Sequence, residues 1–254
     1  MLFRSIFNWT TNAFINYSAL SGDVHDLNLT AGMEVQRSDR QDVGTTGERF
    51  PNTYFETPQN AAIRNGYTFR TASGFLSYFG RANYKLLNRY LFTTTIRSDA
   101  SSRFGDNQRW GTFPSASAAW IFSNEDFMKD NGILTFGKIR ASYGISGNAA
   151  IGDFTWQGTY SAGSDYNGQP GTRPSQLPNA DLTWETSQQT DIALDFGLLN
   201  DRITGSVNYY NRLSKDMLLN ERVPSSSGLQ TVIRNVGEMS NSGWEFNVRS
   251  VNIS

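Results

Sequence analysis

Apolar and polar residues alternate along most of this chain, and this period of two limits the fold more than any other feature. A clear stretch carries its apolar or small residues at Ala72, Gly74, Leu76, Tyr78, Gly80, Ala82 and Tyr84. Successive side chains of a β-strand point to opposite faces, so each such segment predicts a strand with one apolar and one polar face. We count about nine of these strands, which predicts an all-β fold.

The lengths of strands and connections indicate a membrane barrel. Many segments exceed the ~5–6 residues of a globular strand and match the ~9–11 of a tilted membrane strand. Short turns at 21–23, 87–89 and 199–201 alternate with long segments at 38–67, 148–182 and 215–240. Short turns on one side and long loops on the other are typical of outer-membrane barrels. The sequence therefore predicts part of an antiparallel up-and-down transmembrane β-barrel.

Composition excludes several other classes of protein. The 254 residues include 22 basic and 23 acidic side chains, so a net charge of -1 gives no support to nucleic-acid binding. The absence of cysteine excludes disulfides and thiolate metal sites. No apolar run reaches the ~18 residues of a membrane helix. A mean hydropathy of -0.47 still suits a barrel, because only alternate side chains of its strands face lipid.

Short stretches from Arg70 onward, and more loosely from 3 to 35, resemble SusC/RagA-type TonB-dependent outer-membrane transporters. They follow one another in the family's order. They are Arg97-Ser98-Asp99-Ala100-Ser101-Ser102-Arg103-Phe104-Gly105, Arg109-Trp110-Gly111-Thr112-Phe113-Pro114-Ser115, Asn124-Glu125-Asp126-Phe127-Met128, Lys138-Ile139-Arg140-Ala141-Ser142-Tyr143-Gly144, Leu182-Thr183-Trp184-Glu185, Asp191-Ile192-Ala193-Leu194-Asp195-Phe196 and Asn235-Val236-Gly237.

The resemblance implies import of oligosaccharides or peptides across the bacterial outer membrane, powered through TonB beside a SusD-like surface lipoprotein. Family barrels are large, with about 22 strands around a plug domain. We therefore expect 1–254 to be part of the barrel domain, without the plug, the TonB-contacting N-terminal region or the closing C-terminal strand. Nine strands alone would leave costly unpaired edges in lipid. A soluble or surface-attached β-sandwich that binds carbohydrate is the alternative.

No set of side chains predicts catalysis. His25 is the only histidine, which argues against a catalytic triad and a multi-histidine zinc site, and we expect it in a turn. Asp191 and Asp195 share one face of a predicted strand, but roughly 13 Å of strand separates them, beyond the ~9.5 Å limit of a glycosidase pair. We therefore expect no catalytic residue, no metal ligand, no cofactor and no enzymatic activity.

Aromatic residues in an expected external loop are the candidates for substrate binding. Trp156, Tyr160 and Tyr166 could stack on sugar faces, whereas packing within the loop or a membrane girdle is the alternative. The nearby segment 164–168 predicts a solvated turn. The alternation assigns Trp120, Tyr143, Tyr209 and Trp244 to the lipid side, and Arg81, Arg97, Arg140 and Asp195 to the lumen.

Overall fold

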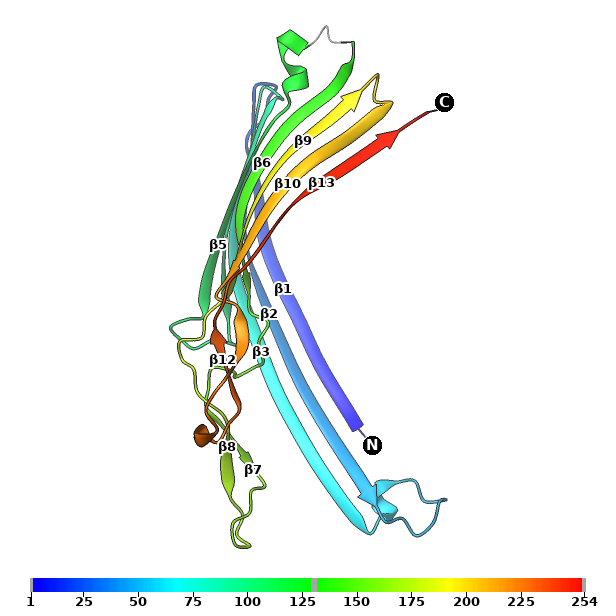
Figure 1. The fold of residues 1–254 in the computed structure, drawn as a ribbon, viewed down its shortest axis with the longest axis vertical. Coiled ribbons are helices and arrows are strands. Elements are labelled where there is room, and N and C mark those ends of the chain that lie inside the picture. Colours follow the sequence, from blue (N-terminus) through cyan, green and yellow to red (C-terminus); the bar gives the residue numbers. More distant parts are fainter. Residues whose placement is uncertain (1, 129–131, 253–254) are drawn as a thin grey trace.

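The computed structural model describes residues 2–128 and 132–252, and nine strands within them form one curved antiparallel sheet (Figure 1). Their order across the sheet is β1-β2-β3-β4-β5-β6-β9-β10-β13. The strands are β1 (Leu2–Leu20), β2 (His25–Glu48), β3 (Ile63–Leu86), β4 (Tyr90–Ser101), β5 (Trp110–Trp120), β6 (Leu134–Asn148), β9 (Glu185–Leu198), β10 (Ile203–Lys215) and β13 (Met239–Ser250). This confirms the predicted all-β, up-and-down arrangement.

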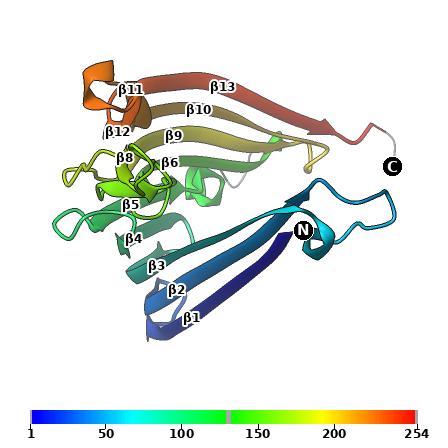
Figure 2. The ribbon, with the colours of Figure 1, turned by 90° about the horizontal axis from the view of Figure 1, so that it is seen from below.

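Short and long connections lie at opposite ends of the sheet (Figures 1 and 2). The short ones are 21–24, 87–89, 199–202 and 121–133, and the last carries the 3₁₀ helices η2 (Phe122–Asn124) and η3 (Asp126–Met128). The sequence of the connection 123–132 predicts one helical turn at 124–128, and η3 lies within that range. Residues 129–131 lie outside the described residues. The long connections are 49–62 with η1 (Pro58–Asn60), 102–109, 149–184, and 216–238 with η4 (Ser225–Ser227). No helix in the described parts is long and apolar enough to cross a membrane.

The sequence Leu-Leu-Asn occurs twice, at 86–88 and 198–200, and both copies lead into tight turns. Leu87 and Asn88 have φ of 52° and 53°, and Leu199 and Asn200 have φ of 53° and 55°. Two successive left-handed residues match the twist of an antiparallel hairpin, and asparagine tolerates this conformation well.

The expected loop 38–67 is wrong in its bounds, because β2 continues to Glu48 and β3 begins at Ile63. The sequence of this charged segment predicts a loop, yet its charged side chains pair within the sheet. Asp42 accepts hydrogen bonds from Arg4 at 2.9 Å and Arg40 at 2.6 Å. These strands exceed the ~9–11 residues that a bilayer requires, so their outer parts meet water on both faces and lose the apolar alternation.

The two longest loops contain short hairpins that the sequence pattern does not predict. β7 (Thr159–Ala162) pairs with β8 (Thr172–Gln176), and β11 (Leu218–Arg222) pairs with β12 (Thr231–Asn235). Strands of four or five residues are too short to show a convincing alternation.

The strand register aligns apolar positions with apolar ones, and polar positions with polar ones, across the sheet. One row of paired residues is apolar or small: Leu27, Tyr84, Phe92, Ala118, Ala141, Ile192, Tyr209 and Trp244. The adjacent row, on the other face, is mostly polar: Asn28, Asn83, Thr93, Ser117, Ser142, Asp191, Tyr210 and Gly243. The apolar face is not packed against protein, since Trp244 is 63% and Phe246 72% exposed.

The alternation along 136–145 predicts a register break near Gly137 and groups Phe136 with Ile139 on the apolar face. The structure places the break between Leu134 and Phe136. Phe136 therefore pairs with Gly197 on the polar face, and its sequence-based grouping with Ile139 is wrong. Gly137 lies under the ring of Phe122, where a side chain would collide. A bulge shifts every later side chain of its strand by one face, and alternation alone locates it only approximately.

Neighbouring residues of β6 provide a test of the two faces. In the complete barrel we expect Ala141→Lys to cost ~2–4 kcal/mol, because it places a charge in the hydrocarbon layer. Ser142→Lys, one position along the same strand, is the matched control and places its charge on the polar face. Urea unfolding in lipid vesicles measures both free energies. Equal losses of stability would contradict the assignment of the faces.

Candidate functional site

Glu125 joins two connections at the short-turn end of the sheet. Its carboxylate accepts hydrogen bonds from Trp120 Nε1 at 3.0 Å, the Tyr90 hydroxyl at 2.8 Å and Arg89 Nη1 at 2.6 Å. These bonds, led by those from Trp120 and Tyr90, hold the pKa of Glu125 below its ordinary value. The contacts position residues 121–128 against the turn 87–89.

The lowered pKa of Glu125 predicts a pH dependence of stability. The carboxylate stabilises the fold above the ordinary glutamate pKa of ~4.3, and this contribution is lost as pH falls through the lower folded-state pKa. We expect Glu125→Gln to lower the thermal midpoint at neutral pH and to differ little from the parent in strong acid. Thermal unfolding in detergent between these limits measures the difference.

The control for this experiment is Glu238→Gln, which removes an exposed carboxylate outside this connection. A difference between Glu125→Gln and the parent that stays constant with pH would show that the charge of Glu125 is not what stabilises the connection.

The polar face of the sheet is lined by paired side chains. Arg97 donates to Asp99 at 2.7 Å and to Ser77 at 2.9 Å, and Arg140 donates to Asp195 at 3.1 Å. The register places all four predicted lumen residues, Arg81, Arg97, Arg140 and Asp195, on this face. Arg97 and Arg140 on this face are therefore each paired with a carboxylate.

Asp191, Asp195 and His25, for which we expect no catalytic role, each contact a neighbouring side chain. Asp191 and Asp195 share the polar face, where Gln189 donates to Asp191 and Arg140 to Asp195. His25 is the first residue of β2 rather than a turn residue, and its Nδ1 lies 2.8 Å from the Tyr84 hydroxyl. In the described residues, no three His, Cys, Asp or Glu side chains are grouped to hold a metal ion.

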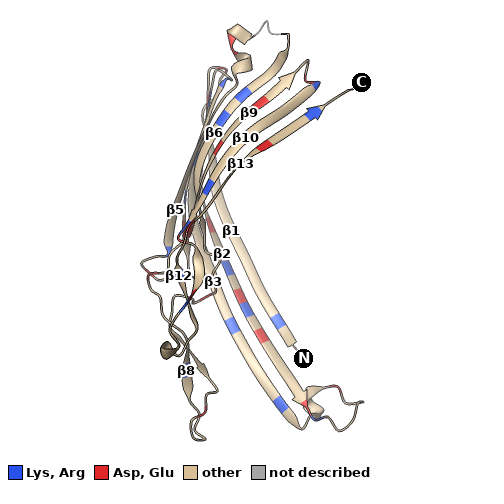
Figure 3. Cartoon of the chain, viewed as in Figure 1, with Lys and Arg blue, Asp and Glu red and all other residues tan. Residues whose placement is uncertain are grey.

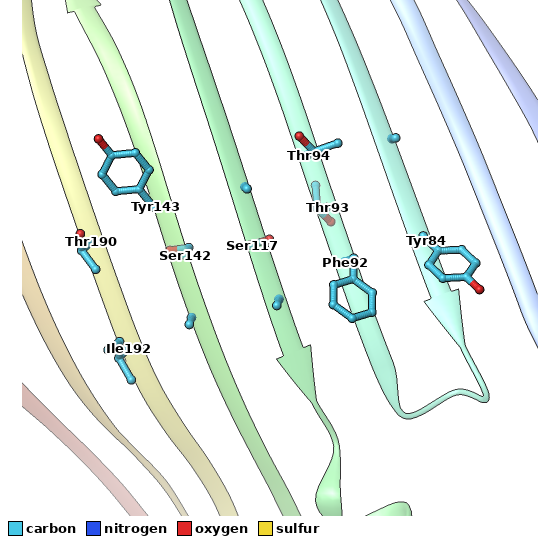
Figure 4. A pocket seen from close by; sticks show the side chains of 13 residues that line it. Tyr84, Phe92, Thr93, Thr94, Ser117, Ser142, Tyr143, Thr190 and Ile192 are labelled. Atoms are coloured by element: carbon cyan, nitrogen blue, oxygen red, sulfur yellow. The ribbon is translucent and has the colours of Figure 1, made fainter.

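A shallow groove of about 560 Å³ lies on the apolar face. Four small side chains form its floor: Ala82, Ala116, Ala118 and Ala141. Tyr84 and Phe92 stand at one side and Tyr143 and Ile192 at the other (Figure 4). Its lining offers few polar groups, so hydrocarbon suits this surface better than a hydrophilic substrate.

A buried aromatic cluster anchors the long loops at the opposite end of the sheet. Its members are Phe104, Phe113, Ala149, Ile151, Leu182 and Trp184. The Trp184 ring centre lies 5.2 Å from that of Phe104 and 5.3 Å from that of Phe113, while its Nε1 donates to the Arg109 carbonyl at 3.0 Å. Phe104 and Leu182 are completely buried. The loops 102–109 and 149–184 therefore share one apolar core.

A polar contact adds to this apolar anchor. Arg103 Nε donates to Asp153 at 3.0 Å, and Arg103 Nη1 donates to the Ala149 carbonyl at 3.2 Å. The Thr71 hydroxyl donates to the second carboxylate oxygen of Asp153 at 2.6 Å. Asp153 thus ties the loop 149–184 both to the loop 102–109 and to strand β3.

Asn235 connects the loops 149–184 and 216–238. Its side-chain oxygen accepts from the Thr183 backbone N–H at 2.9 Å, and its nitrogen donates to the Thr183 carbonyl at 2.8 Å. The same nitrogen donates to the Asp216 carbonyl at 3.0 Å. A second link runs from Asn179 to the Ile233 carbonyl at 2.9 Å. The loops 102–109, 149–184 and 216–238 consequently form one connected body at the end of the sheet opposite the short turns.

The three aromatic residues predicted to bind substrate do not share one environment. Trp156 is half-buried and contacts Gly105, in agreement with the packing alternative. Tyr160 and Tyr166, on the β7–β8 hairpin, are 71% and 86% exposed. Tyr166 lies within the expected turn 164–168, where Asn167 and Gly168 have left-handed φ values of 49° and 75°. Substrate binding by these residues stays a prediction.

A curved sheet with an uncovered apolar face, a polar opposite face, short turns at one end and folded loops at the other defines a wall of a membrane β-barrel (Figures 1 and 3). The family model "TonB dependent receptor-like, beta-barrel" matches residues 3–252. The chain belongs to this family, and the match confirms the resemblance seen in the sequence.

Individual relatives agree with this membership. TonB-dependent receptor SusC of Bacteroides thetaiotaomicron is 35% identical over 253 residues, covering 96% of this chain and 25% of its own length. TonB-dependent receptor P39 of Formosa agariphila is 34% identical over 248 residues, covering 96% and 24%. The solved RagAB peptide transporter superposes with a TM-score of 0.88 at 26% identity, over 98% of this chain and 28% of that one. The chain thus spans about a quarter of these relatives.

Asn235→Ala tests whether the loops act as one body. We expect trypsin to cleave at Arg222 or Arg234 roughly tenfold faster, because each lost hydrogen bond contributes ~1 kcal/mol and the hairpin opens more often. The matched control, Asn220→Ala, removes an exposed asparagine of the same hairpin. Timed digestion with mass spectrometry identifies the cuts. Equal cleavage rates in both variants would show that Asn235 does not restrain the hairpin.

Proposed function

We propose that this chain forms part of the wall of an outer-membrane transporter that imports oligosaccharides or peptides with energy delivered through TonB. The observation that supports this most strongly is the match to the barrel family over residues 3–252, on a sheet with one apolar and one polar face. The apolar face would contact outer-membrane lipid, and the polar face would line the lumen.

The wall itself performs no chemistry in this proposal. Its charged side chains neutralise one another locally, as Arg97 does with Asp99 and Arg140 with Asp195. A neutral hydrated surface lets polar cargo move, whereas an unpaired charge would bind ions and oppositely charged solutes. In this proposal, energy coupling and gating are assigned to the plug domain and the TonB-contacting N-terminal region that the family resemblance implies.

Selection of the cargo is assigned to the connected loop body. Loops held by a rigid scaffold are common sites of recognition, and here the scaffold includes the Trp184 cluster and the Asn235 contacts. Tyr160 and Tyr166 extend from this body as exposed aromatic candidates. We also propose that a SusD-like surface lipoprotein docks at this end, in line with the similarity to SusC and RagAB.

The alternative, a soluble or surface-attached β-sandwich that binds carbohydrate, is not favoured. A sandwich buries the apolar face of one sheet against a second sheet. In the described residues, the only further sheets are the hairpins β7–β8 and β11–β12, which lie in the loops. Phe246 and Trp244 are exposed, and in this proposal lipid hydrocarbon covers them in place of a second sheet.

A loop exchange in the parent transporter tests the proposal. Residues 149–184 are replaced by the aligned loop of a relative with a different substrate preference. We expect uptake of labelled maltoheptaose and of a labelled neutral heptapeptide to shift toward the donor's preference, with unchanged protein in the outer-membrane fraction. Exchange of the short turn 199–202 serves as the control. If the substrate preference is unchanged after the long-loop exchange, the loop 149–184 does not select the substrate.

A further inference from the structure

A pocket of about 200 Å³ opens on the polar face of β1, β2 and β3 near the loop end. Register pairs Asn8 with Ser38 and Ser38 with Ser73, and pairs Thr10 with Gln36 and Gln36 with Phe75. Two adjacent rows of the wall therefore present their side chains to the same space. Arg103 from the loop 102–109 closes one side of it.

Most polar groups of this pocket are free. In the described part of the chain, the side chains of Asn8, Thr10, Ser38 and Ser73 have no hydrogen-bond partner in the protein. Gln36 donates through its nitrogen to Glu34, which leaves its side-chain oxygen available. Polar-face residues farther along the same strands are paired: Asp42 accepts hydrogen bonds from Arg4 and Arg40, and Thr30 donates to Asn16.

Arg103 is a fixed donor whose charge is already balanced. Asp153 holds its Nε at 3.0 Å, and the Ala149 carbonyl holds its Nη1 at 3.2 Å. The remaining Nη2 group can donate to a ligand without further ordering of the side chain. A donor fixed before binding costs less conformational entropy than a mobile one. Asp153 neutralises this guanidinium, and Asp39 pairs with Arg37, the other arginine of the lining, so the pocket does not select for an anion.

Phe75 supplies an apolar wall to an otherwise polar pocket. Its ring packs edge-on against Trp184, with 6.1 Å between ring centres and 75° between planes. This contact with the buried cluster fixes the ring while it lines the pocket. An aromatic ring beside hydroxyl and amide groups complements a molecule that has both C–H faces and hydroxyl edges.

We propose that this pocket binds one ring of a neutral, hydroxyl-rich ligand, as found in an oligosaccharide. The proposal rests on the proposed transport function and assigns a wall subsite to it. The free groups can both donate to and accept from ligand hydroxyls. The cavity is equivalent to roughly seven water molecules at ~30 Å³ each, a space suited to one sugar ring rather than an extended peptide.

The test uses the detergent-solubilised parent transporter and isothermal titration. The probes are maltoheptaose, cellohexaose and mannohexaose, with a neutral heptapeptide as the comparison. The pocket variant, Thr10→Val with Ser73→Ala, removes two free hydroxyls. The matched control, Thr95→Val with Ser117→Ala, makes the same changes at polar-face positions of β4 and β5 outside this pocket. Circular dichroism and thermal unfolding compare the folding of both variants with that of the parent.

We expect at least one saccharide to bind the parent, and the pocket variant to weaken that binding about tenfold or more while the control does not. Equal saccharide affinity in the parent and both variants would overturn the site. Binding of the peptide alone, or of none of the probes, would overturn the ligand class. The proposed transport function is judged separately by uptake, so retained uptake with unchanged saccharide affinity removes only this subsite.

Discussion

Hydrogen bonding between neighbouring strands is the constraint on which the rest of this structure depends. Lipid offers no partner to a backbone N–H or carbonyl group, and each unsatisfied group there costs several kcal/mol. The nine strands therefore follow one another in a continuous antiparallel order, interrupted in sequence only by the loop hairpins. The same ladder fixes the register, and the register gathers alternate side chains into one apolar and one polar face.

The loop end meets a different physical requirement. Water surrounds it, so stability there comes from a small buried core rather than from lipid contact. Trp184 packs against Phe104 and Phe113, and Asp153 and Asn235 add hydrogen bonds between segments distant in sequence. Phe75 and Arg103 connect this core to the polar face, where the further pocket lies. Anchoring of the loops and shaping of the wall surface thus depend on the same residues.

The strength of the sequence pattern varied with the surroundings of each segment. It predicted the faces of Tyr143, Tyr209 and Trp244 because lipid and water on opposite sides enforce alternation. The pattern placed the end of β2 too early in the chain, because both faces of the outer part of β2 meet water and the charged side chains there pair within the sheet. It misplaced Phe136, since a bulge reverses the faces without leaving a compositional sign. It did not reveal the pocket, whose groups look like ordinary polar wall residues.

By itself, the sequence determined the fold class, the number of long strands, the positions of the short turns and the family. Each of these depends on local alternation, on left-handed turn residues or on motifs that are contiguous along the chain. Tertiary structure decided how the loops join, which of Trp156, Tyr160 and Tyr166 are exposed, and which polar residues remain unpaired. Contacts such as Thr71 with Asp153, or Thr183 with Asn235, join residues 82 and 52 positions apart. Only the folded chain brings such groups within hydrogen-bonding distance.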